Sequence, residues 1–325
     1  MPEPVKVLFI GGSGRSGSTL TDRMLGSVPG VCSVGELWAL WKREMQRDEF
    51  CGCGMPFADC PFWRDVVAEA FGTLDAARAS GFAQTQRNVL YHHRGLAVRW
   101  PRLMRQRRRP DFGRFAEERA RVIRAIAAVS GADLIVDSSK VPRYGSALAA
   151  VPGLEVRALH LVRDSRAIAH SWSMAKETRR VGGGTVLMPR YPAALSASRF
   201  VARSLQMEGA WRFTDRLLTL NYEAFVAAPS AWTKRILRFA GHPAPAAPPC
   251  GLKPHTFRLL PTHTILGNPM RFDQGEVLVR RDDRWRTEMD ARDRRLVTRR
   301  TWPLLLRYGY IGPFKASFAR EEGSN

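Results

Sequence analysis

Short apolar runs alternate with amphipathic stretches along the chain. The run at 5–10 is rich in β-branched residues and ends at two glycines, which is typical of a strand buried on both faces. Four further apolar runs are predicted to be strands: 31–36, 132–140, 156–162 and 217–223. Helical periodicity is found at 18–25, 64–130, 163–172, 196–218 and 232–240, and in a last segment up to 307. This alternation predicts one α/β domain over 1–325, with a parallel sheet that carries helices on both faces.

The glycine-rich segment after the first strand is the most informative stretch. A strand, a glycine loop and a helix start form a cradle for phosphate, because glycines allow close backbone approach and unpaired N–H groups face the anion. Residues 12–17 fit the dinucleotide pattern G-x-G-x-x-G, and 12–19 fit the P-loop spacing with Ser18 in place of the lysine. A third pattern places a cation inside the loop, here in Arg-Ser-Gly-Ser-Thr at 15–19. That order resembles the 5′-phosphosulfate loop of sulfotransferases, whose sheet is P-loop-like.

A second motif carries the same resemblance. Arg163 begins Arg-Asp-x-Arg-Ala, and Ser171 follows eight residues after it, which is similar to the 3′-phosphate-binding pattern of the family. A forked guanidinium and a hydroxyl suit a phosphate monoester. Neither the dinucleotide nor the kinase interpretation predicts this second grip. The resemblance therefore implies 3′-phosphoadenosine 5′-phosphosulfate (PAPS) as the donor.

Later segments complete the expected donor site. Tyr222-Glu223 with Pro229 resembles the family's Y-E-x-L/F-V…P segment, and a loop at 267–271 is similar to one that can wrap adenine and the 3′-phosphate. A surface turn would also explain Gly-Asn-Pro in that loop. The expected donor-binding residues are Gly14, Arg15, Ser16, Gly17, Ser18, Thr19, Arg163, Ser171, Tyr222, Gly267, Asn268 and Arg271.

Three residues are the expected catalytic groups. Arg15, backed by Lys140, would stabilise the charge that builds on the leaving phosphate oxygen. Glu36 lies at the carboxyl end of the second predicted strand, where open α/β sheets bind ligands. The resemblance to tyrosylprotein sulfotransferases implies that Glu36 is the general base, whereas a dinucleotide site would place it on a ribose hydroxyl, and capping of the next helix is a structural option. His92 and His93 are the next candidates for the base.

The role expected for Asp137 differs between two classes of enzyme. A small-molecule kinase would use it as a Mg²⁺ ligand with ATP, and this is the alternative function. A cap on the following helix is its structural alternative. Sulfuryl transfer requires no metal, because the donor has no triphosphate, and this agrees with the missing P-loop lysine. An NAD(P) oxidoreductase would need a Tyr-x-x-x-Lys or an equivalent motif, which we do not find.

Residues 64–130 are expected to form a helical insert over the active site. Because this segment interrupts the nucleotide-binding core, we expect it to recognise the acceptor. The basic run at 105–109 is typical of a solvated face, and a functional alternative is that it holds an anionic acceptor or anionic lipid headgroups.

Three of the five cysteines, Cys51, Cys53 and Cys60, lie within ten residues. They could bind zinc with Cys32 or a histidine as the fourth ligand, but C-x-C is not the usual spacing of a zinc motif. Similar cysteine segments occur in bacterial sulfotransferases. We expect a loop over the active site with reduced thiols, and no metal.

The net charge of +21 comes mainly from arginine, which favours partners that carry phosphate, sulfate or carboxylate groups. No aromatic-basic motif supports nucleic-acid binding. The sequence shows neither a signal peptide nor an apolar run of about 18 residues, so we expect a cytoplasmic enzyme. Peripheral contact with an anionic membrane and a homodimer are compatible with the sequence. The predicted function is transfer of a sulfuryl group from PAPS to a hydroxyl of a small-molecule, glycan or glycolipid acceptor.

Overall fold

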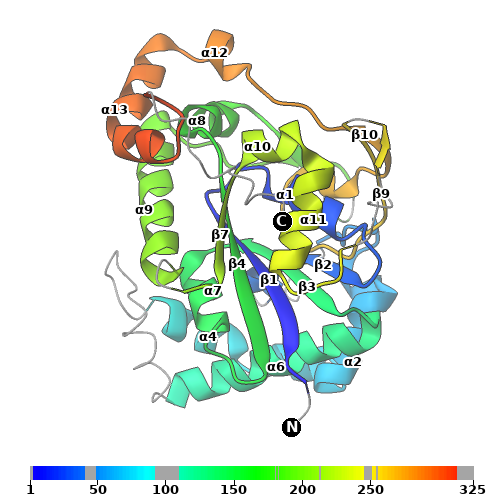
Figure 1. The fold of residues 1–325 in the computed structure, drawn as a ribbon. Helices are drawn as coiled ribbons and strands as arrows, with labels where there is room; N and C mark the ends of the chain where they lie inside the picture. The colour runs from blue at the N-terminus through cyan, green and yellow to red at the C-terminus, as the bar shows by residue number, and fades with distance from the viewer. Residues whose placement is uncertain are drawn as a thin grey trace, which may run out of the picture.

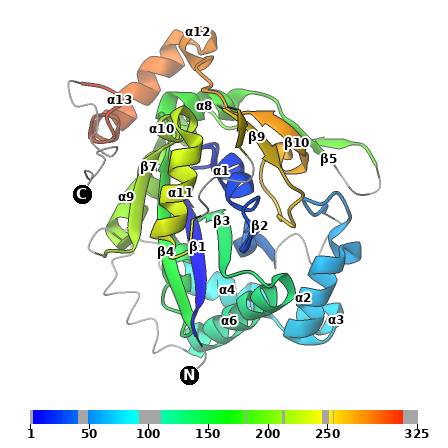
Figure 2. The ribbon, with the colours of Figure 1, turned by 45° about the vertical axis from the view of Figure 1, so that its right-hand side comes forward.

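The computed structural model describes residues 3–40, 49–91, 110–179, 181, 183–211, 214–244, 251–253 and 255–312. Five parallel strands form the central sheet in the order β2, β3, β1, β4, β7. Their bounds are β1 Val5–Gly12, β2 Val31–Gly35, β3 Leu134–Lys140, β4 Leu154–Val162 and β7 Leu217–Asn221. All five predicted strands are present, and helices flank the sheet on both sides (Figures 1 and 2), so the predicted α/β fold is confirmed.

The other elements surround this sheet. The helices are α1 Ser18–Leu25, α2 Pro61–Phe71, α3 Leu74–Ala79, α4 Phe82–Tyr91, α6 Pro110–Ser130, α7 Pro142–Leu148, α8 Ser165–Ser173, α9 Ala193–Trp211, α10 Tyr222–Ala227, α11 Pro229–Phe239, α12 Trp285–Glu288 and α13 Ala291–Arg307, with 3₁₀ turns η1 Leu37–Ala39, η3 Phe57–Asp59 and η4 Pro269–Phe272. Two small antiparallel sheets pair β5 Glu177–Arg179 with β6 Thr185–Leu187, and β9 Thr256–Leu259 with β8 Gly251–Lys253 and β10 Gly275–Leu278. The sequence pattern did not reveal these short strands. Among the described residues, no helix is both long enough and apolar enough to cross a lipid bilayer.

Helices cover both faces because successive side chains of β1 point to opposite sides. Phe9 packs into one apolar cluster with residues of α6, α7 and α9. Leu8 and Ile10 belong to the cluster on the other face, with residues of α1, α10 and α11. All three side chains are fully buried, as expected for a strand covered on both faces.

Two predicted boundaries were wrong. The fifth strand ends at Asn221, and Tyr222 begins helix α10 instead of ending the strand. Tyr222, Phe225 and Val226 are all buried in one cluster, which is the spacing of a helical face. The predicted helix 196–218 ends earlier, at the end of α9, because the last residues of that range begin β7.

The insert contributes four of the described helices. Helices α2 and α4 pack on α6, which lies against one face of the sheet (Figure 2). The segment 92–109, with His92, His93 and the basic run 105–109, lies outside the described residues.

Arg23 ties helix α1 to a segment near the end of the chain. Its side chain is completely buried. Its guanidinium donates to four backbone carbonyls, with Nη1 at 3.1 Å from Met270 and 2.5 Å from Arg271, and Nη2 at 2.9 Å from Leu260 and 2.7 Å from Asp273. The segment 260–273 is therefore held against the helix that follows the glycine loop.

We expect Arg23→Met to lower the free energy of unfolding by about 3–5 kcal/mol, because several buried carbonyls lose their donor. Chemical denaturation of the full chain measures the change. Arg121→Met is the matched control. Arg121 forms an exposed pair with Glu117 at 3.1 Å on one helix face, so its loss should cost about 0.5 kcal/mol or less. Equal effects of the two substitutions would contradict the role assigned to Arg23.

Candidate active site

The glycine loop between β1 and α1 has the geometry of an anion cradle. Gly17 immediately precedes α1 and has a φ of 92°, which favours glycine. A Cβ atom there would lie 2.2 Å from the ring of Tyr222, so the close approach of this ring also requires glycine. Arg15 has a φ of 67°, a rare conformation for a residue with a side chain. The first N–H groups of α1 have no partner within the helix and can face an anion.

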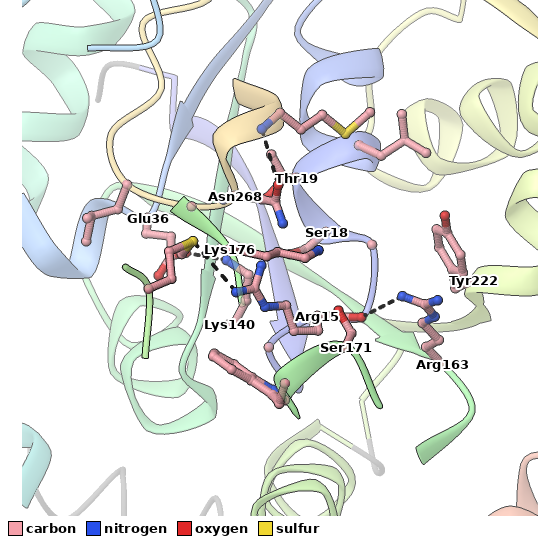
Figure 3. A pocket seen from close by; sticks show the side chains of 18 of the residues that line it. Arg15, Ser18, Thr19, Glu36, Lys140, Arg163, Ser171, Lys176, Tyr222 and Asn268 are labelled. Atoms are coloured by element: carbon pink, nitrogen blue, oxygen red, sulfur yellow. Dashed lines mark hydrogen bonds and ion pairs between the residues drawn. The ribbon is translucent and has the colours of Figure 1, made fainter. Parts of the chain in front are cut away.

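A cavity of about 640 Å³ opens beside this loop (Figure 3). Most of the expected site residues line it: Gly14, Arg15, Gly17, Ser18, Thr19, Glu36, Lys140, Arg163, Ser171, Tyr222, Gly267 and Asn268. The structure does not place Ser16 or Arg271 on the cavity wall. The side chain of Ser16 is buried, and the buried guanidinium of Arg271 lies 4.6 Å from the ring centroid of Phe272.

Glu36 and Lys140 meet at one side of the cavity. Glu36 follows strand β2, and Lys140 is the last residue of the neighbouring strand β3. The carboxylate Oε1 of Glu36 and the ammonium Nζ of Lys140 lie 2.5 Å apart. The indole Nε1 of Trp38 donates to Oε2 of Glu36 at 3.3 Å. The backbone N–H of Glu36 donates to the carbonyl of Ile265 at 2.9 Å. Both carboxylate oxygens and the backbone of Glu36 therefore have partners that fix their orientation.

Arg15 lies against an aromatic wall. Its guanidinium carbon is 4.7 Å from the ring centroid of Trp172, within the range of a cation–π contact. Burial lowers the pKa of Arg15, and the nearby Glu36 opposes this shift. Lys176 lines the same cavity, and its pKa is lowered by burial and then by the positive charges of Arg15 and Arg163. Cations thus crowd together here, which favours an anionic ligand.

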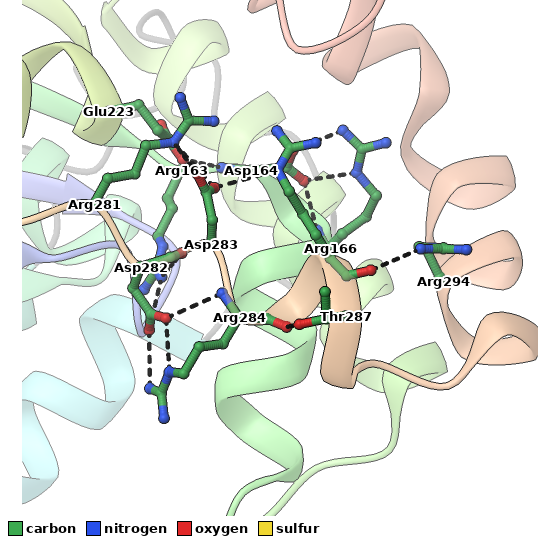
Figure 4. A network of polar contacts seen from close by, with 11 residues as sticks. Arg163, Asp164, Arg166, Glu223, Arg281, Asp282, Asp283, Arg284, Thr287 and Arg294 are labelled. Carbon is green, nitrogen blue, oxygen red and sulfur yellow. Dashed lines mark hydrogen bonds and ion pairs between the residues drawn. The ribbon is translucent and has the colours of Figure 1, made fainter.

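Arg163 lies on the side of the cavity away from Glu36 (Figure 3), and Figure 4 shows it beside Asp282. Its Nη1 donates to the carbonyl of Arg15 at 3.2 Å, and its Nη2 is 3.4 Å from a carboxylate oxygen of Asp282. The guanidinium carbon is 5.0 Å from the ring centroid of Tyr222. Asp282 also pairs with Arg284 at 2.9 Å. These interactions, with the hydrogen bond from Arg284 the largest and Arg163 also contributing, lower the pKa of Asp282 to about 2.

The wall at 266–268 comes from near the end of the described chain. Gly267 has a φ of 110°, and a Cβ atom there would lie 3.4 Å from Oγ1 of Thr19 and 3.9 Å from Oε1 of Glu36. The N–H of Asn268 donates to the same Thr19 oxygen at 3.4 Å. This wall therefore contacts the first turn of α1 and lies close to Glu36.

Asp137 lies away from the cavity wall. Its side chain is buried, and Oδ1 accepts hydrogen bonds from the N–H of Ser139, at 3.0 Å, and from the Ser139 hydroxyl. Burial raises its pKa to about 6. These contacts hold the end of β3 that leads to Lys140. The expected cap on the following helix was wrong, because Val141 stands at the N-cap of α7 and no side chain caps it. The contacts still support a structural role for Asp137 over a magnesium site.

The sequence did not identify several residues of the cavity wall. Two of them, Lys176 and Asp282, carry charge, and others form an apolar and aromatic side of the cavity: Trp38, Trp172, Met188, Tyr191 and Leu278. Most of them come from loops or short elements without a phosphate motif. Lys176 follows α8 closely, and its place after the Arg163 motif was the only available signal.

The described helices of the insert line none of this cavity. They support it from behind, because Gln86 of α4 donates to the carbonyl of Trp38 at 2.7 Å and Arg119 of α6 donates to Gln86 at 2.5 Å. The expectation of an insert over the active site is therefore not supported by 64–91 and 110–130.

Comparisons with known proteins bear on the family and the fold of the chain. The sequence profile described as "Sulfotransferase family" matches residues 8–246. A search of curated protein sequences gives no significant match. Among solved structures, the sulfotransferase domain of the Synechococcus PCC 7002 olefin synthase is 20% identical with a TM-score of 0.50, and the match covers 92% of this chain and 95% of that one. The sulfotransferase domain from the curacin biosynthetic pathway is 15% identical with a TM-score of 0.47, over 92% and 98% of the two chains. With more than half of its length matched by the profile, the chain belongs to the sulfotransferase family.

Proposed function

We propose that this sulfotransferase uses PAPS as the donor and a hydroxyl of a small-molecule, glycan or glycolipid as the acceptor. One observation carries the proposal: two separate sets of residues suited to binding an anion line the same cavity. The first set is the glycine loop with Arg15, and the second is Arg163 with Ser171. PAPS has phosphate at both the 5′ and the 3′ position, so it needs two such sets.

The cavity residues fit this donor in charge and position. N–H groups at the start of α1 and the hydroxyls of Ser18 and Thr19 would hold the 5′-phosphosulfate. Arg163 and Ser171 would hold the 3′-phosphate, with the ring of Tyr222 between the two sets. Asn268 donates a hydrogen bond to Thr19 and Gly267 directly precedes it, so we place both residues near the 5′ side and not around the 3′-phosphate.

The chemical step needs a fixed cation and a base. The donor supplies an activated sulfuryl group whose departure leaves negative charge on a phosphate oxygen. Arg15 and Lys140 are the cations that would stabilise this charge, more strongly in the transition state than in the ground state. Glu36 would accept the proton of the acceptor hydroxyl, because Lys140 and Trp38 hold its two oxygens in place at the cavity wall.

The alternative, a kinase that uses ATP-Mg²⁺, has less support. Ser18 replaces the P-loop lysine, and Asp137 is engaged by Ser139 behind the cavity wall. The two carboxylates among the described residues that line the cavity, Glu36 and Asp282, each pair with a cation. The single-domain boundary at 1–325, the cytoplasmic location, the acceptor role of the insert, membrane contact and a homodimer remain predictions.

The donor assignment predicts a nucleotide preference. We expect adenosine 3′,5′-bisphosphate to bind more tightly than ATP or NADPH, and to do so equally with Mg²⁺ or with a chelator. Isothermal titration calorimetry of the full chain measures the three affinities. Tight binding of ATP that depends on Mg²⁺ would instead support the kinase.

The 3′-phosphate assignment predicts opposite effects of two neighbouring side chains. Arg163→Ala should weaken the binding of adenosine 3′,5′-bisphosphate by about 10- to 150-fold, because a charged hydrogen bond is lost. The affinity for adenosine 5′-phosphate should change little. Asp282→Asn should strengthen the binding of the bisphosphate, because the carboxylate no longer competes for Arg163.

The matched control for the second substitution is Asp283→Asn, since Asp283 lies next in the chain but pairs with Arg281 and Arg286 outside the cavity wall. Equal losses for the two nucleotides in Arg163→Ala would refute the assignment.

The proposed base predicts a split between turnover and binding. Glu36→Gln should lower turnover by about 10²- to 10⁴-fold, while the affinity for adenosine 3′,5′-bisphosphate changes little. Release of the bisphosphate from PAPS, measured with a panel of alcohols and phenols, reports turnover. Glu155→Gln is the control, because Glu155 pairs with Arg157 on β4 and does not line the cavity. Full activity of Glu36→Gln would remove it as the base.

A further inference from the structure

We propose that Cys51, Cys53, Cys60 and His263 bind one structural Zn²⁺ ion, outside the cavity and independently of the proposed function. Their three Sγ atoms and a ring nitrogen of His263 all lie within 4.8 Å of one another. Three thiolates and one imidazole form a common zinc ligand set. Among the described residues, this is the cluster whose donor atoms could hold a metal ion.

The spacing of the donor atoms fits a tetrahedral zinc site. Zn–S and Zn–N bonds of about 2.3 and 2.1 Å place two sulfurs about 3.8 Å apart, and a sulfur and a nitrogen about 3.6 Å apart. Cys60 Sγ lies 3.6 Å from Cys51 Sγ and 3.7 Å from Cys53 Sγ. The Nδ1 atom of His263 lies 3.3 Å from Cys60 Sγ and 3.7 Å from Cys51 Sγ. A disulfide would require about 2.05 Å between two of these sulfurs.

The surrounding structure holds the histidine ring in position. The ring of Phe62 stacks on His263 with 4.5 Å between centroids and an angle of 14°. The indole Nε1 of Trp63 donates to the His263 carbonyl at 2.9 Å. Cys51 and Cys60 are fully buried. Metal-binding histidines need such support from neighbouring groups, because ring orientation decides which nitrogen faces the ion.

The two glycines of the cysteine loop also fit this arrangement. The N–H of Gly52 donates to the carbonyl of Thr264 at 2.9 Å, and a Cβ atom at Gly52 would lie 2.4 Å from the Thr264 hydroxyl. Only glycine permits this close approach between the two segments. Gly54 has a φ of 92°, which allows the turn after Cys53. The C-x-C spacing therefore follows from a tight loop that packs directly on the segment with the fourth ligand.

This assignment replaces the expectation of a metal-free loop of reduced thiols. Cys32, one of the two fourth ligands considered from the sequence, lies on β2 and outside the cluster. His263 supplies the fourth position, although it is 203 residues from Cys60. Four protein ligands leave no open position, so the ion would be structural and would take no part in the transfer.

The ion would stabilise one wall of the cavity. Ile265, two residues after His263, accepts the N–H of Glu36 at 2.9 Å and donates to Val34 at 3.0 Å. Gly267 follows on the cavity wall. A metal that joins the cysteine loop to His263 would thus fix the segment that positions Glu36.

Metal analysis of the full chain tests the proposal. We expect about one equivalent of zinc per chain in protein purified without a chelator. Exchange with Co²⁺ should give the intense visible bands of tetrahedral cobalt and a thiolate charge-transfer band. Cys60→Ser and His263→Ala should lose the zinc or bind it far more weakly, and His263→Cys should retain it. Cys32→Ser is the matched control and should keep one equivalent, since its thiol lies outside the cluster.

Metal analysis of the unsubstituted chain is enough to overturn the proposal. The test therefore does not depend on whether the variants fold. Absence of zinc after purification, with no tetrahedral cobalt spectrum when Co²⁺ is added to the reduced protein, would refute the site. A disulfide among Cys51, Cys53 and Cys60 in protein purified under reducing conditions, found by mass spectrometry, would also refute it.

Discussion

The structure depends on holding several positive charges at the carboxyl edge of one parallel sheet. Arg15, Lys140, Arg163 and Lys176 line a single cavity. Like charges this close repel one another, and burial adds to the cost. The fold offsets this by giving three of them a partner: Arg15 lies on Trp172, Lys140 pairs with Glu36, and Arg163 contacts both Asp282 and Tyr222. A dianionic or trianionic ligand would relieve the remaining repulsion, so the cavity is prepared for anions before any ligand arrives.

Sequence patterns predicted the site residues that lie at the ends of strands. In a parallel sheet all carboxyl ends meet at one edge, so the sequence alone could predict that Arg15, Glu36, Lys140 and Arg163 lie close together. The same patterns missed Asp282, because the pairing of a remote loop with Arg163 leaves no local signal. They also misassigned Tyr222 to a strand, since an aromatic residue near a strand end suits either type of element.

The cysteine loop shows the same limit in a different form. Three close cysteines are visible in the sequence, but the histidine that completes the cluster belongs to a segment more than 200 residues later. Spacing rules for zinc motifs assume that all ligands lie in one short stretch of sequence. Here the ligands come from two segments that are far apart in the sequence. Similarly, Arg271 matched a family motif, yet its side chain is buried away from the cavity. Sequence order gives the backbone position of such a residue but does not give the direction of its side chain.

The buried contacts of Arg23 bear on how the chain is made. Arg23 leaves the ribosome well before its carbonyl partners, which lie 237 to 250 residues later in the chain. A guanidinium cannot be buried without acceptors, so α1 cannot reach its final packing while those residues are still inside the ribosome. The nascent chain therefore exposes the apolar face of α1 until residues 260–273 have left the ribosome, and this interval is when it depends most on chaperones.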